Sequence, residues 1–308
     1  MATEVPDRTD AADAPHPAFE GYAAESPPQA AVGAPGKDGV LKLTFAPTSG
    51  GTALVHDYAT VPFHVSGTLA HDPHPDAATV FVQSPTGGVA QGDRHDVAIS
   101  VEGNATAHVS TQSSTKVQSM THNYAAAGAS LSVGRGGHLD YVPEPTILHA
   151  DARYSQDLTL SLDAGATAVL GDIVVPGRLA RGERFEFERY LSRVRAEGPN
   201  GPLFEDATHL APGESDPAAP GVLGEFAVYG TLFVVAPGTD AAGTSDELHA
   251  VVTDCEARAG ATALPNGAGV AVRALGDRAE TVQSALHAAW DSARRDLVGA
   301  PAPSGRKY

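Results

Sequence analysis

The chain has 308 residues, which is enough for one substantial core or two modest ones, and we expect one domain with terminal tails. Its 20 Lys and Arg residues against 37 Asp and Glu residues give a net charge of −17, which repels nucleic-acid phosphates and anionic lipid headgroups. Neither a nucleic acid nor a membrane is therefore an expected partner.

The composition also bears on the compartment. Lysine is rare, and the acidic, Ala- and Gly-rich surface suits a salt-rich cytoplasm in which ions screen self-repulsion, although an acidic protein from a GC-rich genome has a similar composition. Cys255 is the single cysteine, which excludes an intrachain disulfide and a thiolate metal cluster. No apolar run of about 18 residues and no leader pattern occur, so we expect a soluble cytoplasmic protein.

The two ends of the chain lack any hydrophobic period. Residues 1–38 are rich in Ala, Pro, Asp and Glu. They bury too little apolar area to offset the entropy of ordering, so a flexible, partly disordered acidic arm is expected there. The tail at 300–308 has a similar composition and is expected to be flexible. One β-scaffold domain over 39–299 is therefore predicted.

From Val40 to about Val235, polar and apolar residues alternate in short runs such as "VLKLTF", "ATVFVQS" and "DLTLSLD". A period of two is typical of half-buried strands, so the predicted fold class is mainly β. Segments beginning at Ile99, Leu131 and Leu160 each contain a strand, a Gly-containing turn and a second strand, about 30 residues apart. This repeat fits either a solenoid or a sandwich.

The last quarter of the chain has helical periodicity. One helix is predicted to start at Thr244, with Glu247 completing a capping box, and a second to start at Asp277, with Glu280 in the same role. A short strand at 269–275 separates them. The apolar stripe of the second helix comprises Val282, Leu286, Ala289, Trp290, Ala293 and Leu297.

The loop "TGGVAQGDRHD" at 86–96 has the glycine spacing of a phosphate cradle, from Gly87 to Gly92. Such a cradle needs Lys and Ser or Thr where Asp93 and Arg94 stand here, and it opens a helix, whereas "DRHDVAISVE" continues as a strand. Glycine adopts positive φ and allows backbones to approach closely. A tight connection between strands is therefore predicted instead of a nucleotide site.

A histidine-rich segment is the most evident candidate for a metal site. His64, His71 and His74 lie near Asp72 and Asp76, and imidazole and carboxylate ligands suit Ni, Zn or Cu ions. The spacing is not that of a closed zinc site, and the neighbouring prolines favour an exposed loop. A solvated loop is the preferred interpretation.

Four short motifs stand in order along the β region: "SPTGGVAQGDRHDVAISVEGNATAHVSTQSSTKV" (84–117) contains a GG-x-x-GGD-like loop and a T-x-x-x-x-K stretch, and 136–185 contains "LDYVP" and "GRLARGERF". "GTLFVV" follows at 230–235. Together they resemble the urease accessory protein UreD family, called UreH in some organisms, over roughly residues 40–298. Gln91 departs from the family's second loop glycine, and Pro145 stands after Glu144 where the family usually has an acidic residue.

The resemblance implies a β-helix-like scaffold of many short strands with two C-terminal α-helices, and no catalytic activity. Proteins of this family help to install nickel and the carbamylated lysine bridge in apo-urease, and they link that enzyme to UreF and, through UreF, to the GTPase UreG. The implied partners are therefore UreF, UreG and the urease apoenzyme, with no tightly bound cofactor and with transient Ni²⁺. The acidic, lysine-poor composition predicts a halophilic source for this chain.

A transient route for Ni²⁺ needs weak, successive oxygen or nitrogen ligands, because one closed site would trap the ion. The candidate ligands on the matched motifs are Asp93, Thr111, Asp140, Glu144 and Glu183. A turn cap or a scaffold salt bridge is the alternative role of each. The candidate structural positions are Gly87, Gly88, Gly92, Lys116, Arg178 and Gly182, and ion pairs are expected for the Lys and the Arg.

Two other function classes stay open on the residues alone. The carboxylate pairs Glu183/Glu186 and Asp151/Asp157 fit acid–base work in a β-helical carbohydrate-active enzyme. A surface β-solenoid binding protein is the second alternative. An aromatic content of 6% weighs against a sugar-binding groove, and the lack of a secretion signal weighs against a surface protein.

Overall fold

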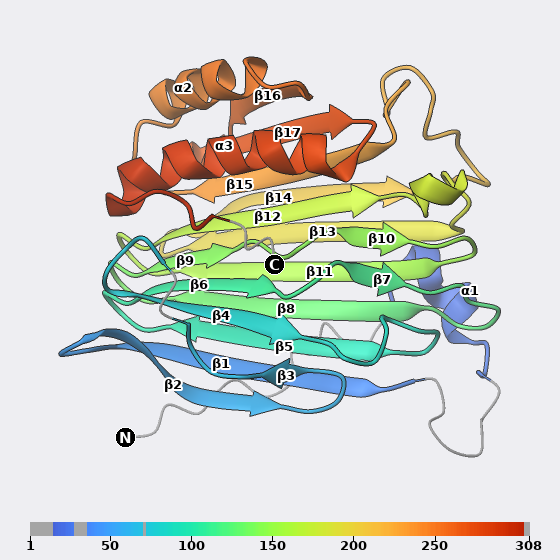
Figure 1. The fold of residues 1–308 in the computed structure, drawn as a ribbon, viewed down its shortest axis with the longest axis horizontal. Helices are drawn as coiled ribbons and strands as arrows, with labels where there is room; N and C mark the ends of the chain where they lie inside the picture. Colours follow the sequence, from blue (N-terminus) through green and yellow to red (C-terminus); the bar gives the residue numbers. More distant parts are fainter. Residues whose placement is uncertain (1–14, 28–35, 70–71, 305–308) are drawn as a thin grey trace.

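The computed structural model describes residues 15–27, 36–69 and 72–304, which form two large β-sheets that face each other (Figure 1). The first sheet contains, in spatial order, β14 (Gly201–Leu210), β13 (Arg189–Gly198), β11 (Arg153–Leu162), β8 (Ala125–Val133), β5 (Arg94–Val101), β1 (Asp38–Thr48) and β2 (Gly51–Ala59). The second contains β16 (Arg258–Ala263), β17 (Gly269–Gly276), β15 (Val228–Val235), β12 (Thr167–Val175), β9 (His138–Tyr141), β6 (Thr106–Thr111), β4 (Ala77–Gln83) and β3 (His64–Val65), with β10 (Thr146–Leu148) beside β12 and β7 (Thr115–Val117) beside β10.

The central strands of both sheets run parallel and stay in register from one repeat to the next. In the first sheet Ile99 of β5 lies beside Leu131 of β8, which lies beside Leu160 of β11. In the second sheet β6, β9 and β12 pair in the same way. The repeats found in the sequence are therefore successive turns of a solenoid, since the strands of a sandwich run antiparallel. The predicted mainly β, β-helix-like fold is confirmed.

The core lies between the two sheets and follows the alternation of the strands. In β1, Leu41, Leu43 and Phe45 are at most 1% exposed, whereas the residues between them are partly exposed. Successive side chains of a strand point to opposite faces, so the apolar set of each strand reaches the same interior. The period-two pattern of the sequence predicted this core.

The two predicted C-terminal helices are present as α2 (Ala241–Thr253) and α3 (Ala279–Val298). They pack with β12, β15 and β17 in one hydrophobic cluster and cover part of the second sheet (Figure 1). Val282, Leu286, Ala289, Trp290 and Ala293 of the predicted stripe are buried. Among the described residues, no helix is both long and apolar enough to cross a membrane.

The helix starts differ from the predicted ones. Asp240, not Thr244, caps α2, because its carboxylate accepts a hydrogen bond from the amide of Gly243 at 3.1 Å and starts the helix one turn earlier. The predicted box at Asp277 does not form, since α3 follows Arg278 without a side-chain cap. Residues 258–263 form β16, a strand between the two helices that the sequence did not predict.

Part of the predicted acidic arm lies against the first sheet. Residues 15–27 include α1 (Glu20–Ala23), a single helical turn, and the side chain of Phe19 before it is 0% exposed. At the other end of the chain, the amide of Ala302 donates to the carboxylate of Asp291 on α3 at 2.9 Å. The predicted flexible ends also include residues 1–14, 28–35 and 305–308, which lie outside the described residues.

Candidate functional site

The five predicted nickel ligands lie in three separate places near the ends of the solenoid strands. Asp93 precedes β5, and Glu183 lies between β12 and β13, whereas the other three candidates lie near α3. Each of the five already accepts a hydrogen bond from the chain. Within the described part of the chain, no group of three or more His, Cys, Asp or Glu side chains is placed to hold a metal ion.

Asp93 organises the turn that leads into β5. Its side chain is 1% exposed, and its carboxylate accepts hydrogen bonds at 2.9 Å from the amides of Lys37 and Ala90. The ammonium group of Lys37 lies 4.0 Å from the same carboxylate. Asp93 thus ties the start of β1 to the start of β5, because its two oxygens satisfy amides from both segments.

Glu183 has a similar role between β12 and β13. Its carboxylate accepts from the amide of Ala150 at 2.9 Å and from Nε of Arg178 at 2.7 Å. Burial opposes ionisation, but the hydrogen bonds from Arg178 and from backbone amides prevail and lower the pKa of Glu183. Gly182 beside it adopts a φ of 80° at the end of a short 3-10 turn. This cluster stabilises the connection between two solenoid turns.

Thr111 and Glu144 are the two candidate ligands that touch each other. The hydroxyl of Thr111, at the end of β6, accepts from the amide of Glu144 at 2.9 Å. The carboxylate of Glu144 in turn accepts from the side-chain amide of Gln283 on α3 at 3.2 Å. Both residues are partly exposed, so solvent reaches this corner between β6, β9 and α3.

Asp140 lies at the centre of a buried charge cluster beneath α3. Its two oxygens accept from Nε1 of Trp290 at 2.7 Å and from Nε of Arg294 at 2.8 Å. Burial by itself would raise the pKa of Asp140, but His138, with Nε2 at 3.2 Å, and Arg294 hold it well below its usual range. Arg294 also reaches Asp72 at 2.7 Å. The ionised Asp140 therefore joins α3 to the second sheet.

The histidine-rich segment forms a hydrogen-bonded turn. The amide of His74 donates to the carboxylate of Asp72 at 2.8 Å, and Nδ1 of His74 accepts from the amide of Asp76 at 3.2 Å. His64 begins β3, and His71 lies outside the described residues. Asp72 serves the ion pair with α3, so this segment connects the edge of the second sheet to that helix.

Comparison with known proteins identifies the family. A family model described as UreD urease accessory protein matches residues 37–307. The chain belongs to the UreD family. It is 78% identical over 298 residues to the urease accessory protein UreD of Haloarcula marismortui. The aligned residues make up 97% of this chain and 100% of that relative. The resemblance seen in the motifs is therefore confirmed, and the similarity to a protein of a halophilic archaeon supports a halophilic source.

More distant relatives match the chain over almost the same length. The urease accessory protein UreD of Natronomonas pharaonis is 44% identical over 293 residues, which is 94% of this chain and 98% of that protein. UreD 2 of Streptomyces griseus is 33% identical over 288 residues, which is 92% of this chain and 98% of that protein. The likeness to UreD proteins thus extends over both sheets and the C-terminal helices.

The glycine loop that opens the UreD-like motifs packs against β7. Gly88 has a φ of 121°, and the amide of Val89 donates to the carbonyl of Lys116 at 2.8 Å. Gly87 and Gly92 also have positive φ values, of 82° and 79°. The side chain of Lys116 is exposed, whereas Arg178 pairs with the carboxylate described above. The loop connects β4 of the second sheet to β5 of the first and leads into a strand instead of a helix.

A half-buried carboxylate in this UreD family chain was missed in the sequence. Asp172 of β12 accepts hydrogen bonds from Gln156 of β11 at 3.0 Å and from Tyr190 and Ser192 of β13 at 3.3 Å. These partners lie on the opposite sheet, so the carboxylate lies between the sheets, and burial raises its pKa. The available signal was one acidic residue within the apolar run "AVLGDIVV".

The pH dependence of stability should reveal Asp172. Because the pKa of Asp172 is raised in the folded state, its ionised form destabilises that state at neutral pH. As the pH falls through the pKa of the folded state toward the pKa of the unfolded state, near 4, protonation of Asp172 removes this destabilisation. Asp172→Asn should therefore increase the free energy of unfolding at pH 7, and this gain should shrink as the pH approaches 4. Denaturant titrations in high salt at several pH values measure it. A gain that grows toward acid pH would contradict the assignment.

Proposed function

We propose that this chain is a urease maturation factor that links apo-urease to UreF and, through UreF, to the GTPase UreG, and that it assists nickel insertion. The observation that carries the proposal is the family match over 37–307, together with relatives covered almost end to end. The name of those relatives, urease accessory protein, supports a role in maturation in place of catalysis. Neither a carbohydrate-active enzyme nor a surface binding protein has comparable support.

The fold supports a linking role. In-register parallel strands and a continuous core hold the two sheets as one body, so surfaces on different elements keep a fixed relative position. α2 and α3 cover part of the second sheet, whereas the short segment 15–27, within the described part of the chain, packs on the first sheet (Figure 1). Such a body can present separate surfaces to an enzyme and to a second accessory protein.

Nickel is the cargo in this proposal and not a resident cofactor. The proposed route uses the five candidate oxygen ligands, among which Thr111 and Glu144 are partly exposed and hold only single hydrogen bonds to their partners. Asp93, Asp140 and Glu183 are buried and bound to amides or cations, so they also hold the scaffold together. A weakly held carboxylate suits an ion that must bind and leave.

Co-purification tests the proposal. In high salt, the tagged chain co-expressed with UreF, UreG and apo-urease should retain UreF and urease, and urease isolated from this mixture should contain nickel. The variant Glu144→Gln should keep the complex and reduce the nickel content of urease several-fold, because an amide is a weaker ligand for a divalent ion. Glu186→Gln, at an exposed carboxylate outside the five candidate ligands, is the matched control.

Two results would count against the proposal at different levels. If neither UreF nor urease is retained, the linking role is wrong. The second result concerns variants that still form the complex, namely Glu144→Gln and alanine variants of the other four candidate ligands. If all of them leave the nickel content of urease unchanged, nickel does not pass along these residues.

A further inference from the structure

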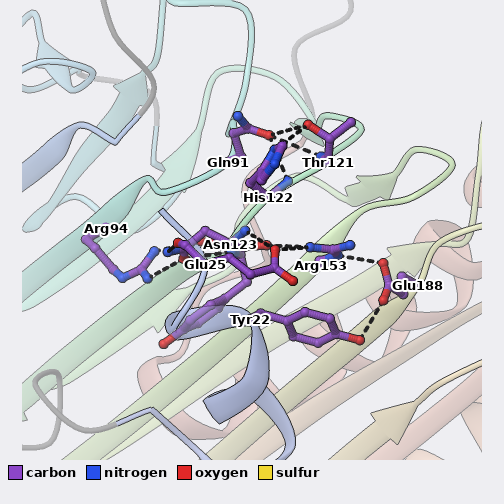
Figure 2. A network of polar contacts seen from close by, with 10 residues as sticks. Tyr22, Glu25, Gln91, Arg94, Thr121, His122, Asn123, Arg153 and Glu188 are labelled. Atoms are coloured by element: carbon purple, nitrogen blue, oxygen red, sulfur yellow. Dashed lines mark hydrogen bonds and ion pairs between the residues drawn. The ribbon is translucent and has the colours of Figure 1, made fainter. Parts of the chain in front are cut away.

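Residues 15–27, called the strap from here on, cross the starts of neighbouring strands of the first sheet (Figure 2). Phe19 packs against Leu191 of β13 and against Tyr124, which precedes β8. Pro27, at the other end of the strap, packs beside Gly92, which precedes β5. The strap therefore runs across the sheet from β13 to β5.

The surface beneath the strap contains three arginines and one tyrosine. β5, β11 and β13 each begin with an arginine, namely Arg94, Arg153 and Arg189, and the last two are register partners. The guanidinium of Arg94 lies 4.2 Å from the ring centroid of Tyr124. We call Arg94, Tyr124, Arg153, Arg189 and Leu191 the arginine–tyrosine surface. It gathers three cations in a chain of net charge −17, of which Arg153 also pairs with Glu188 and Arg189 with Glu214, and tyrosine and arginine are enriched at binding hot spots.

The strap matches this surface with two aromatic rings and one carboxylate. Phe19 is fully buried, and the guanidinium carbon of Arg153 lies 4.5 Å from the centroid of the Tyr22 ring. The carboxylate of Glu25 accepts from Arg153 at 3.1 Å and from the amide of Asn123 at 2.9 Å. The recognised pattern therefore consists of an aromatic residue (Phe19), a second aromatic residue three positions later (Tyr22) and a carboxylate three positions after that (Glu25).

The surface is held in place by contacts that do not involve the strap. Nε of Arg153 donates to Glu188 at 2.5 Å, and Arg94 donates to Asn123 at 3.0 Å. The hydrophobic cluster around Phe19 is separate from the three larger clusters that contain the sheet interiors and the helices. Departure of the strap would expose Tyr124 and Leu191 and leave the main cores intact.

We propose that the arginine–tyrosine surface is a docking site for an acidic, aromatic peptide segment of a partner protein, and that the strap occupies it in the free chain. All residues of the surface lie within 37–307, the part that matches the UreD family model. A segment tethered to the same chain has a high effective concentration, so it suppresses binding in trans until a partner segment competes successfully. This inference is independent of nickel transfer.

A labelled peptide with the sequence of residues 15–27 provides the probe. In the full-length chain, the triple variant Phe19→Ala/Tyr22→Ala/Glu25→Ala releases the strap. Fluorescence anisotropy in high salt should show that the peptide binds this variant at least about tenfold more tightly than the unchanged chain, because the tether no longer competes. Adding Arg153→Gln should weaken this binding about tenfold. Glu20→Ala in the strap and Arg181→Gln, both at exposed positions, are the matched controls.

A second preparation avoids any effect of the substitutions on folding. A protease site inserted between Pro27 and Gly36 allows the strap to be cut after folding, and the cut strap should then exchange for the labelled peptide. The proposal is overturned if the peptide binds neither preparation better than a scrambled peptide, or if it binds the unchanged chain equally well. The proposal would also be overturned if the unchanged chain forms a dimer and the triple variant does not. That result would mean that the strap is exchanged between two copies of the chain.

Discussion

Replacing Arg294 by methionine should lower the free energy of unfolding by about 3–5 kcal/mol, which is the usual cost of removing one partner from a buried ion pair. The Arg294 side chain is 0% exposed and binds two carboxylates, Asp140 and Asp72, whose side chains are at most 1% exposed. It also donates to the carbonyl of Pro301. Methionine fills a similar volume but leaves both carboxylates buried without their cation.

The adjacent residue provides the control for this prediction. Arg295 lies on the same helix, but its side chain is 57% exposed and pairs with Asp291 one turn earlier. Arg295→Met should therefore change stability by less than about 0.5 kcal/mol. Chemical denaturation in high salt measures both variants. A loss below about 1 kcal/mol for Arg294→Met would mean that the cluster is hydrated or rearranges easily.

Alanine at Gly88 should destabilise the fold by at least about 3 kcal/mol, because the backbone and a neighbour both oppose a side chain there. Gly88 has a φ of 121°, and an added Cβ would lie 2.3 Å from the carbonyl oxygen of Lys116. That carbonyl accepts the hydrogen bond from Val89 that fixes the loop against β7. The loop has to move, and the start of β5 has to move with it.

Gly87→Ala separates the two causes. Gly87 has a φ of 82°, but no atom lies within 4 Å of an added Cβ, so only the backbone preference is lost, at about 1 kcal/mol. Thermal unfolding of both variants in the same buffer gives the comparison. Equal losses would mean that positive φ alone, and not the contact with Lys116, makes glycine necessary in this loop.

Local patterns were sufficient to predict the strands and the repeat that build the two sheets. Ile99, Leu131 and Leu160 occupy the same place in three similar segments, and the structure brings them into register. Alternation along a strand depends only on neighbouring residues, so it can be read directly from the sequence. The choice between solenoid and sandwich required strand pairing, which joins residues about 30 positions apart.

Helix ends were less predictable than helix faces. The stripe of α3 follows from a period of 3.6, whereas both expected caps were misplaced, because Asp240 competes with Thr244 and because β17 extends to Gly276 before α3. Arg294 falls on the buried face of α3 although it is charged. Only the two carboxylates from distant segments explain why it is tolerated there.

The sequence by itself determined the fold class, the two C-terminal helices and the UreD family resemblance, because each of these depends on periods and short motifs. Tertiary structure alone decided what the polar residues do. It placed Asp93 and Glu183 in turns, joined Asp140 to Arg294 across more than 150 positions of sequence, put Asp172 between the sheets and laid Phe19 on the first sheet. Contacts between segments far apart in the chain produce no local pattern in the sequence, because the packing of the two sheets and the helices determines which residues meet.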